Sequence, residues 1–233
     1  DVLDQVYSKG MIRVETKIKR KDGQIIDVEL SGRVLGQTSK NIATFIRDIT
    51  KQKISDQILN TRVELVEYSN LHNLKELLRF TLDKVEELTS SQIGFYHFYN
   101  EDNNELSNQA WSSNTENTCN LTILHSETND QNNKDGVNKL GLWFDAIRNK
   151  KPIIHNDYNS LTHKKGLPDG HMDLVRELIV PVFRADKIVA LVGVGNKATN
   201  YTQQDVETTQ LLADLAWEIS EKKRADIALA ENE

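Results

Sequence analysis

One cysteine and six histidines are the side chains of this sequence best suited to nucleophilic or metal chemistry. They are Cys119, His72, His97, His125, His155, His163 and His171. A soft thiolate and an imidazole are ligand types that hold haem iron. Hydrogen bonding to a nearby strand or turn is the simpler explanation of His155 and His171, and packing or solvation explains His72 and His97.

Cys119 falls in a polar segment, residues 114–138, that is rich in Asn, Thr and Asp. This segment is predicted to be a loop, and a loop longer than ~12–15 residues in a compact domain is more often functional than merely connecting. Cys119 and His171 can line one pocket only if this loop folds over a sheet. A nucleophilic thiol also needs a base and an oxyanion site, and the sequence identifies neither. A Cys119-dependent enzyme therefore remains an alternative without a recognisable catalytic motif.

Other motifs are weak or absent. Gly193, Gly195 and Ala198 fit the spacing G-x-G-x-x-A, but the next helix is predicted only from Thr202 and no strand follows it. A dinucleotide site needs that helix to begin at the glycines, so these glycines more simply end a strand. The phosphate-binding, serine-hydrolase and zinc-protease motifs are missing. A single cysteine excludes an internal disulfide and a thiolate zinc cluster.

Charge and hydropathy argue against several classes of partner. Twenty-nine basic and 35 acidic side chains give a net charge of −6, and the mean hydropathy is −0.55. No basic stripe indicates nucleic-acid binding. No apolar run approaches the ~20 residues that span a bilayer. Residues 1–10 do not form a secretory leader, so we expect a cytoplasmic protein.

The elements that position these residues begin with a three-stranded antiparallel sheet. Ile12, Val14 and Ile18 alternate with charged residues, which is the period of a half-buried strand. Asp22-Gly23 predicts a hairpin, and further alternating segments follow at residues 26–31 and 41–48. A sheet of this size is only marginally stable by itself.

Residues 50–90 are predicted to be helical, with a break near residues 69–73. The spacing of Ile54, Ile58, Thr61 and Leu65 is typical of a coiled-coil seam, and Leu59, Val63 and Val66 flank it. Two interpretations stay open. The helix either forms a dimer through this seam or packs its apolar face on its own domain.

A second group of strands and helices follows. Strands are predicted at residues 91–100, 105–112, 152–155, 178–183 and 188–194, with a short helix at 140–150. The run at 188–194 is apolar at both parities, as in a central strand that is covered on both faces. A final helix starts at Thr202 with a capping-box-like sequence. It stays helix-prone and charged to the last residue, which suggests continuation into another domain.

Two family resemblances emerge from these residues. Residues 10–52, with Lys19-Arg-Lys-Asp-Gly23 and the closing Phe45-Ile-Arg-Asp-Ile-Thr50, resemble the C-terminal half of a PAS domain. Residues 57–222 resemble a GAF domain of bacterial and archaeal sensor histidine kinases. The GAF resemblance rests on Ala110-Trp111-Ser112, Cys119, Gly141-Leu-Trp143, residues 151–158 (KPIIHNDY), residues 166–171 (GLPDGH), Val180-Pro-Val, residues 192–197 (VGVGNK), Tyr201 and Asp205.

The resemblance implies an α+β fold. An antiparallel sheet of five or six strands would have the N- and C-terminal helices packed on one face and a ligand pocket on the other, with a small three-stranded PAS remnant beside it. Some relatives in methanogenic archaea are haem-based redox sensors. Carried over by position, Cys119 would be the thioether or thiolate site and His171 a ligand of the haem iron. Other relatives have no known haem, so an unknown small ligand is the alternative. GAF methionine-sulfoxide reductases use several cysteines, which this chain lacks.

The resemblance also predicts how the chain is organised and what it does. Residues 1–50 would be the C-terminal part of a PAS domain, 51–72 a signalling linker and 73–222 the GAF domain, whose first helix starts as early as residue 57. Residues 223–233 would lead into a transmitter domain. We expect the sensory region of a two-component histidine kinase that signals through a homodimer to a response regulator. The alternative is a ligand-free GAF domain that only dimerises or acts as a spacer.

Overall fold

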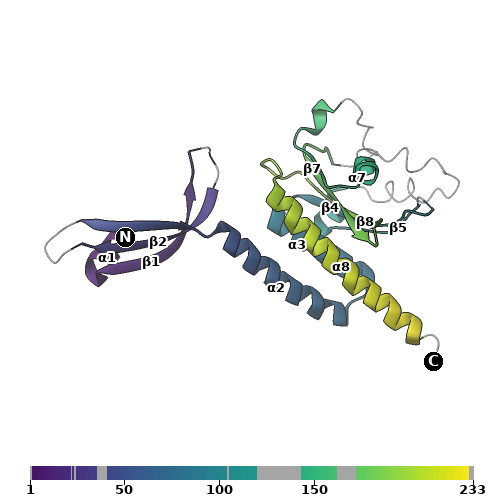
Figure 1. Ribbon diagram of the computed structural model, residues 1–233, viewed down its shortest axis with the longest axis horizontal. Coiled ribbons are helices and arrows are strands. Elements are labelled where there is room, and N and C mark those ends of the chain that lie inside the picture. Colours follow the sequence, from purple (N-terminus) through teal and green to yellow (C-terminus); the bar gives the residue numbers. More distant parts are fainter. Residues whose placement is uncertain are drawn as a thin grey trace. The chain divides into compact units, whose positions relative to one another are not determined.

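The computed structural model describes residues 2–21, 23, 25–35, 41–103, 105–119, 143–161 and 172–230. The chain forms two compact units, Asp1–Leu59 and Asn60–Glu233, and the boundary falls inside a long helix (Figure 1). Each unit has its own sheet. No helix in these described ranges is long and apolar enough to span a membrane.

The first unit is a three-stranded antiparallel sheet that follows a short helix, α1 (Val2–Lys9). Its strands are β1 (Met11–Lys19), β2 (Ile25–Val34) and β3 (Ile42–Asp48), in the order β1-β2-β3. The predicted three-stranded sheet is therefore confirmed. Gly23, with φ +89°, lies in the connection between the first two strands, as the hairpin signal indicated.

Helix α2 (Thr50–Leu71) begins directly after β3, where the Asp48 carboxylate accepts a hydrogen bond from the Thr50 backbone N–H at 3.0 Å. The helix buries Ile58, Thr61 and Leu65. Leu65 belongs to the core of the second unit, together with residues of the C-terminal helix. The apolar spacing that is typical of a coiled-coil seam therefore packs, at Leu65, on the domain of its own chain.

The second unit contains a five-stranded antiparallel sheet in the order β5-β4-β8-β7-β6. This sheet confirms the predicted α+β fold, and the strands fall close to the expected positions. Their bounds are β4 (Ile93–Asn100), β5 (Glu105–Trp111), β6 (Ile153–His155), β7 (Glu177–Arg184) and β8 (Lys187–Gly195). Strand β8 lies at the centre and is almost wholly buried, which explains why its sequence is apolar at both parities.

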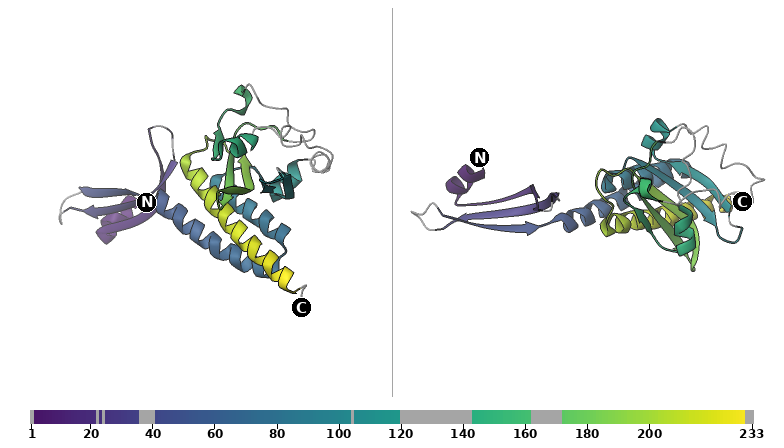
Figure 2. Two further views of the ribbon diagram at one scale, coloured as in Figure 1. Left: turned by 45° about the vertical axis from the view of Figure 1, so that its right-hand side comes forward. Right: turned by 90° about the horizontal axis from the view of Figure 1, so that it is seen from above.

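Two helices cover one face of this sheet, α3 (Leu74–Thr89) and α8 (Gln203–Ala230) (Figure 2). Asn73 and Glu76 form a capping box that starts α3, since each side chain accepts from the other's backbone N–H. Asp205 accepts from the Thr202 backbone N–H at 2.8 Å at the start of α8. The core between these helices and the sheet includes Leu78, Leu82, Tyr96, Val182, Val192, Ala213 and Ala216.

The opposite face of the sheet carries the alternate side chains of the same strands. Ile179 and Leu191 pack there with Ala146 of the short helix α7 (Trp143–Asn149). A second short helix, α4 (Ser113–Thr118), follows β5 and ends at Cys119. The prediction of a loop from residue 114 was wrong for these residues, because the Ser112 side chain caps the helix by accepting from the Thr115 N–H. The rest of that predicted loop, from residue 120, lies outside the described residues.

Candidate functional site

Cys119 is buried at the C-terminal end of α4, with 7% of its surface exposed. Its Sγ accepts a hydrogen bond from the backbone N–H of Met172 at 3.5 Å. The thiol also packs with Trp111, Phe95 and Met172 in one apolar cluster. Two segments that are 53 residues apart in sequence therefore meet at this thiol.

The second candidate, His171, lies outside the described residues, and its proposed role stays a prediction. The next residue in the chain, Met172, is the one that contacts the Cys119 sulfur. His125, which shares the predicted loop with Cys119, also lies outside the described residues.

An aromatic wall adjoins the thiol on the same side of the sheet. Phe95 and His97 come from alternate positions of β4, with ring centroids 4.8 Å apart, and the Trp111 ring meets His97 edge-on at 5.5 Å. His97 is 2% exposed, and burial lowers its pKa to about 3. Its imidazole is therefore neutral at physiological pH. The sequence prediction treated His97 as a packing or solvated residue. Its two-residue spacing from Phe95 is the signal that could have placed both side chains on one face of the strand.

Trp111 adds a polar group to this apolar wall. The residue is 9% exposed, and its indole Nε1 is buried without a hydrogen-bond partner in the described part of the chain. Indole N–H groups are donors only, and buried ones usually find an acceptor. The site therefore combines a thiol, flat ring faces, a neutral imidazole and one unused donor.

The segment after Met172 is fastened to the end of β8 by Asn196. Its Oδ1 accepts from the Val175 N–H and its Nδ2 donates to the Asp173 carbonyl, both at 2.8 Å. Asn196 itself has φ +62°, which is a left-handed conformation that asparagine tolerates. Gly193 and Gly195 end the strand in front of this turn, and α8 starts eight residues after Gly195, at Gln203. The glycines therefore serve strand packing and this turn.

The remaining described histidines have structural partners. His155 lies 2.7 Å from a Glu177 oxygen through Nδ1, with both side chains largely buried. His72 stacks on Tyr68 at a centroid distance of 3.6 Å. Within the described ranges, no three His, Cys, Asp or Glu side chains are arranged to hold a metal ion.

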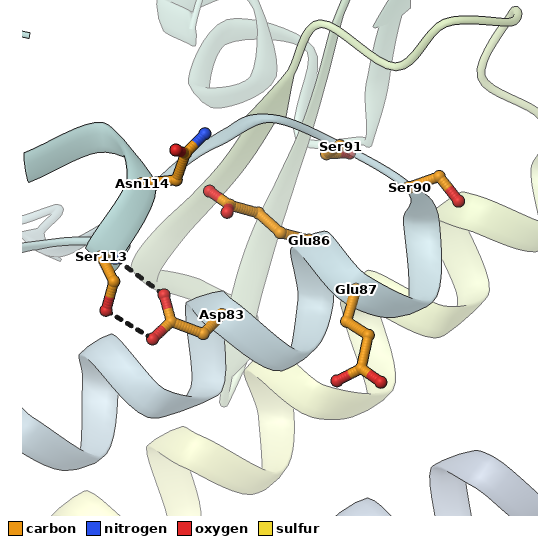
Figure 3. A pocket seen from close by; sticks show the side chains of 7 residues that line it. All are labelled: Asp83, Glu86, Glu87, Ser90, Ser91, Ser113 and Asn114. Atoms are coloured by element: carbon orange, nitrogen blue, oxygen red, sulfur yellow. Dashed lines mark hydrogen bonds between the residues drawn. The ribbon is translucent and has the colours of Figure 1, made fainter. Parts of the chain in front are cut away.

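A separate polar cavity of about 510 Å³ lies where α3 ends and α4 begins (Figure 3). It is lined by Asp83, Glu86, Glu87, Ser90, Ser91, Ser113 and Asn114. The Asp83 carboxylate accepts hydrogen bonds from the backbone N–H and the hydroxyl of Ser113, each at 2.7 Å. Because α3 packs on the helical face of the sheet, this cavity is distinct from the Cys119 cluster.

The chain belongs to the GAF domain family, whose sequence profile matches residues 72–220. Solved GAF domains have the same fold. That of a phosphoenolpyruvate-protein phosphotransferase from Coxiella burnetii covers 73% of this chain and 97% of its own, at 16% identity and a TM-score of 0.54. Free methionine-R-sulfoxide reductase from Neisseria meningitidis covers 74% and 91%, at 9% identity and a TM-score of 0.51. These likenesses show the fold alone.

Among curated proteins, the chain is similar to the methyl sulfide methyltransferase-associated sensor of Methanosarcina acetivorans. The two are 32% identical over 237 aligned positions, which include 97% of this chain. The aligned part is only 23% of that sensor's length. The chain therefore spans about a quarter of the curated protein that it matches.

Proposed function

We propose that this chain is the sensory region of a signalling protein and that the Cys119 face of its GAF domain is the receptor site. The hydrogen bond from the Met172 N–H to the Cys119 sulfur carries the proposal, because it joins the thiol to the segment that follows His171. Similarity to a sensor along nearly the whole chain supports the same assignment.

The ligand that best suits these side chains is haem. Cys119 would supply a thiolate or thioether bond and His171 an imidazole ligand, while Phe95 and Trp111 offer flat apolar surface. The Trp111 N–H, which has no partner in the described part of the chain, would donate to an anionic group of such a ligand. Bound haem would supply an iron whose oxidation state can change. The protein would exclude water, hold the ligand and respond to that change through β4 and β8.

An absorption spectrum of the purified chain with added haem tests this site. We expect a Soret band that Cys119→Ala abolishes and His171→Ala shifts. His155→Ala is the matched control and should leave the band unchanged, because His155 is engaged by Glu177. The absence of a Soret band, or a band that Cys119→Ala leaves unchanged, would favour the ligand-free spacer. Turnover of an acyl substrate that depends on Cys119 would favour the enzyme instead.

We further propose that the parent protein is a two-component histidine kinase, with the first unit as the C-terminal half of a PAS domain. A change at the receptor site would alter the packing of α8 and α2, and the kinase would pass phosphate to a response regulator. Such a relay needs two helix arrangements that the receptor site favours unequally. The close packing of α8 on the sheet through Ala213 and Ala216 supports this route.

A homodimer in this scheme uses the outer stripe of α2. Leu59, Val63 and Val66 are 60%, 53% and 47% exposed and lie on one side of the helix, whereas Leu65 is buried in its own domain. We expect Val66→Cys in a Cys119→Ser background of the parent protein to form disulfide-linked dimers. Gln57→Cys should not do so, because Gln57 is exposed on the opposite side of α2. Equal cross-linking at both positions would contradict this seam.

A further inference from the structure

Glu86 is the unusual residue of the polar cavity in Figure 3. It sits on the last turn of α3 and is only 8% exposed, and its carboxylate points across the cavity toward Asn114. One of its oxygens, Oε1, is buried and has no hydrogen-bond partner in the described part of the chain. Buried carboxylates are normally paired or fully hydrogen-bonded, so this acceptor has unused binding capacity.

The other acidic groups of the cavity are already engaged. Asp83 accepts two hydrogen bonds from Ser113, and Glu87 is paired with Lys84 at 3.5 Å. Burial, together with the negative charge of Asp83, raises the pKa of Glu86 to about 7, although a hydrogen bond from Ser112 acts against this. The Tyr201 hydroxyl lies 2.8 Å from the hydroxyl of Ser91, which lines the cavity.

The lining has no basic side chain of its own. Its seven residues are three carboxylic acids, three serines and one asparagine, so the field inside is negative and hydrogen-bond acceptors predominate. A cation complements such a lining. The described residues do not offer three ligands arranged for a metal ion. A group with several N–H donors matches separate carboxylate and hydroxyl oxygens better than a metal that demands fixed coordination.

We propose that this cavity binds a small primary ammonium ion, with the Glu86 carboxylate as its anionic partner. The ammonium group donates to the Glu86 carboxylate and to neighbouring hydroxyl or amide oxygens, while its carbon chain lies along the open mouth. The site is independent of Cys119, so its occupancy does not require the proposed receptor ligand. Binding ionises Glu86 and releases a proton when the carboxyl is protonated beforehand.

Calorimetric titration of the whole chain with n-butylammonium chloride tests the proposal. We expect saturable binding that 1-butanol, of the same chain length but uncharged, and sodium chloride at equal ionic strength do not reproduce. Between pH 6 and pH 8 the affinity should rise about ninefold, because the ionised fraction of Glu86 rises from about 10% to about 90% with a pKa of about 7.

Two isosteric variants provide the decisive comparison. Glu86→Gln should weaken n-butylammonium binding at least tenfold and remove its pH dependence. Glu218→Gln, on α8 and outside the cavity lining, should stay within threefold of the parent chain, because the Glu218 side chain is 66% exposed and faces Arg184 at 3.6 Å. Cys119→Ala should have no effect. Binding that survives Glu86→Gln, equal binding of 1-butanol or a flat pH profile would each overturn the proposal.

Discussion

Gly193→Ala should lower the free energy of unfolding by on the order of 3 kcal/mol. Gly193 pairs directly with Phe95 across the central strands, and the Phe95 ring occupies the space above the glycine. A Cβ at residue 193 would overlap that ring and lie only 3.0 Å even from its Cδ1. Both strands are central in the sheet, so neither can move aside cheaply. Chemical denaturation, followed by tryptophan fluorescence, measures the loss.

A second glycine and a second variant make this result specific. Gly32→Ala, within strand β2, should cost less than about 1 kcal/mol, because the nearest atoms lie 3.4 Å from its would-be Cβ. This variant is followed by far-UV circular dichroism, because the first unit contains no tryptophan. Combining Gly193→Ala with Phe95→Leu should recover part of the loss, since the smaller side chain leaves room and the two effects are then non-additive. A strictly additive pair, or equal losses at both glycines, would refute the proposed packing.

Glu86→Gln should change how the stability of the GAF unit depends on pH. The folded chain keeps the Glu86 proton up to about pH 7, whereas the unfolded chain loses it near the ordinary value of 4.5. The folded state therefore binds more protons in this window, and its stability falls as the pH rises. At pH 8 the ionised Glu86 carboxylate lowers the free energy of unfolding by on the order of 2–3 kcal/mol. The Glu86→Gln variant, which carries no charge there, should be more stable by this amount.

His97 changes the stability of the folded state with pH in the opposite direction. Folded His97 stays neutral down to about pH 3, whereas the unfolded side chain protonates near 6.5, so stability rises with pH between these values. Each group contributes a slope of up to about 1.4 kcal/mol per pH unit. Between about pH 4.5 and 6.5 the contributions of Glu86 and His97 to the free energy of unfolding change with pH in opposite directions and offset each other in the parent chain. In the Glu86→Gln variant only the His97 contribution remains, so stability rises with pH in this range.

Urea denaturation at several pH values measures these slopes. All three tryptophans lie in the second unit, so their fluorescence reports on the domain that holds Glu86 and His97. Exposed ion pairs, such as Arg20 with Asp48, affect parent and variant equally and cancel in the difference. Glu87→Gln should follow the parent curve. A Glu86→Gln curve that runs parallel to the parent curve would show that Glu86 is ionised normally in the folded state.

Hydrophobic periodicity predicted the sheets well, because the pattern of a strand is contained within a few consecutive residues. The apolar run of β8 indicated a covered central strand, and the alternation in β1 indicated a half-buried one. The same local signal left two interpretations of α2 open. That helix has apolar residues on two sides, and only tertiary packing determines that Leu65 faces the core while Val63 stays exposed.

The candidate sites depend on contacts that no local pattern contains. Cys119 was predicted from its residue type, but its neighbour Met172 comes from a segment 53 residues away. Nothing in the local sequence around Glu86 indicates that its side chain is buried. It is buried because β4 has a glycine opposite: a Cβ on Gly94 would lie 3.1 Å from Glu86 Oε1. A glycine in one element thus creates the room for a carboxylate in another, and such pairs emerge only after folding.

Strand β8 presents Gly193 to the Phe95 ring on one side and Val192 to the α8 alanines on the other. This two-sided role limits how the domain can be re-engineered. A chimera that takes the receptor face of another GAF protein must also take its β8 strand. Adjacent residues of this strand pack against different partners on the two faces of the sheet. Substitutions there will be tolerated only in matched sets, which makes β8 the natural unit of exchange for biosensor construction.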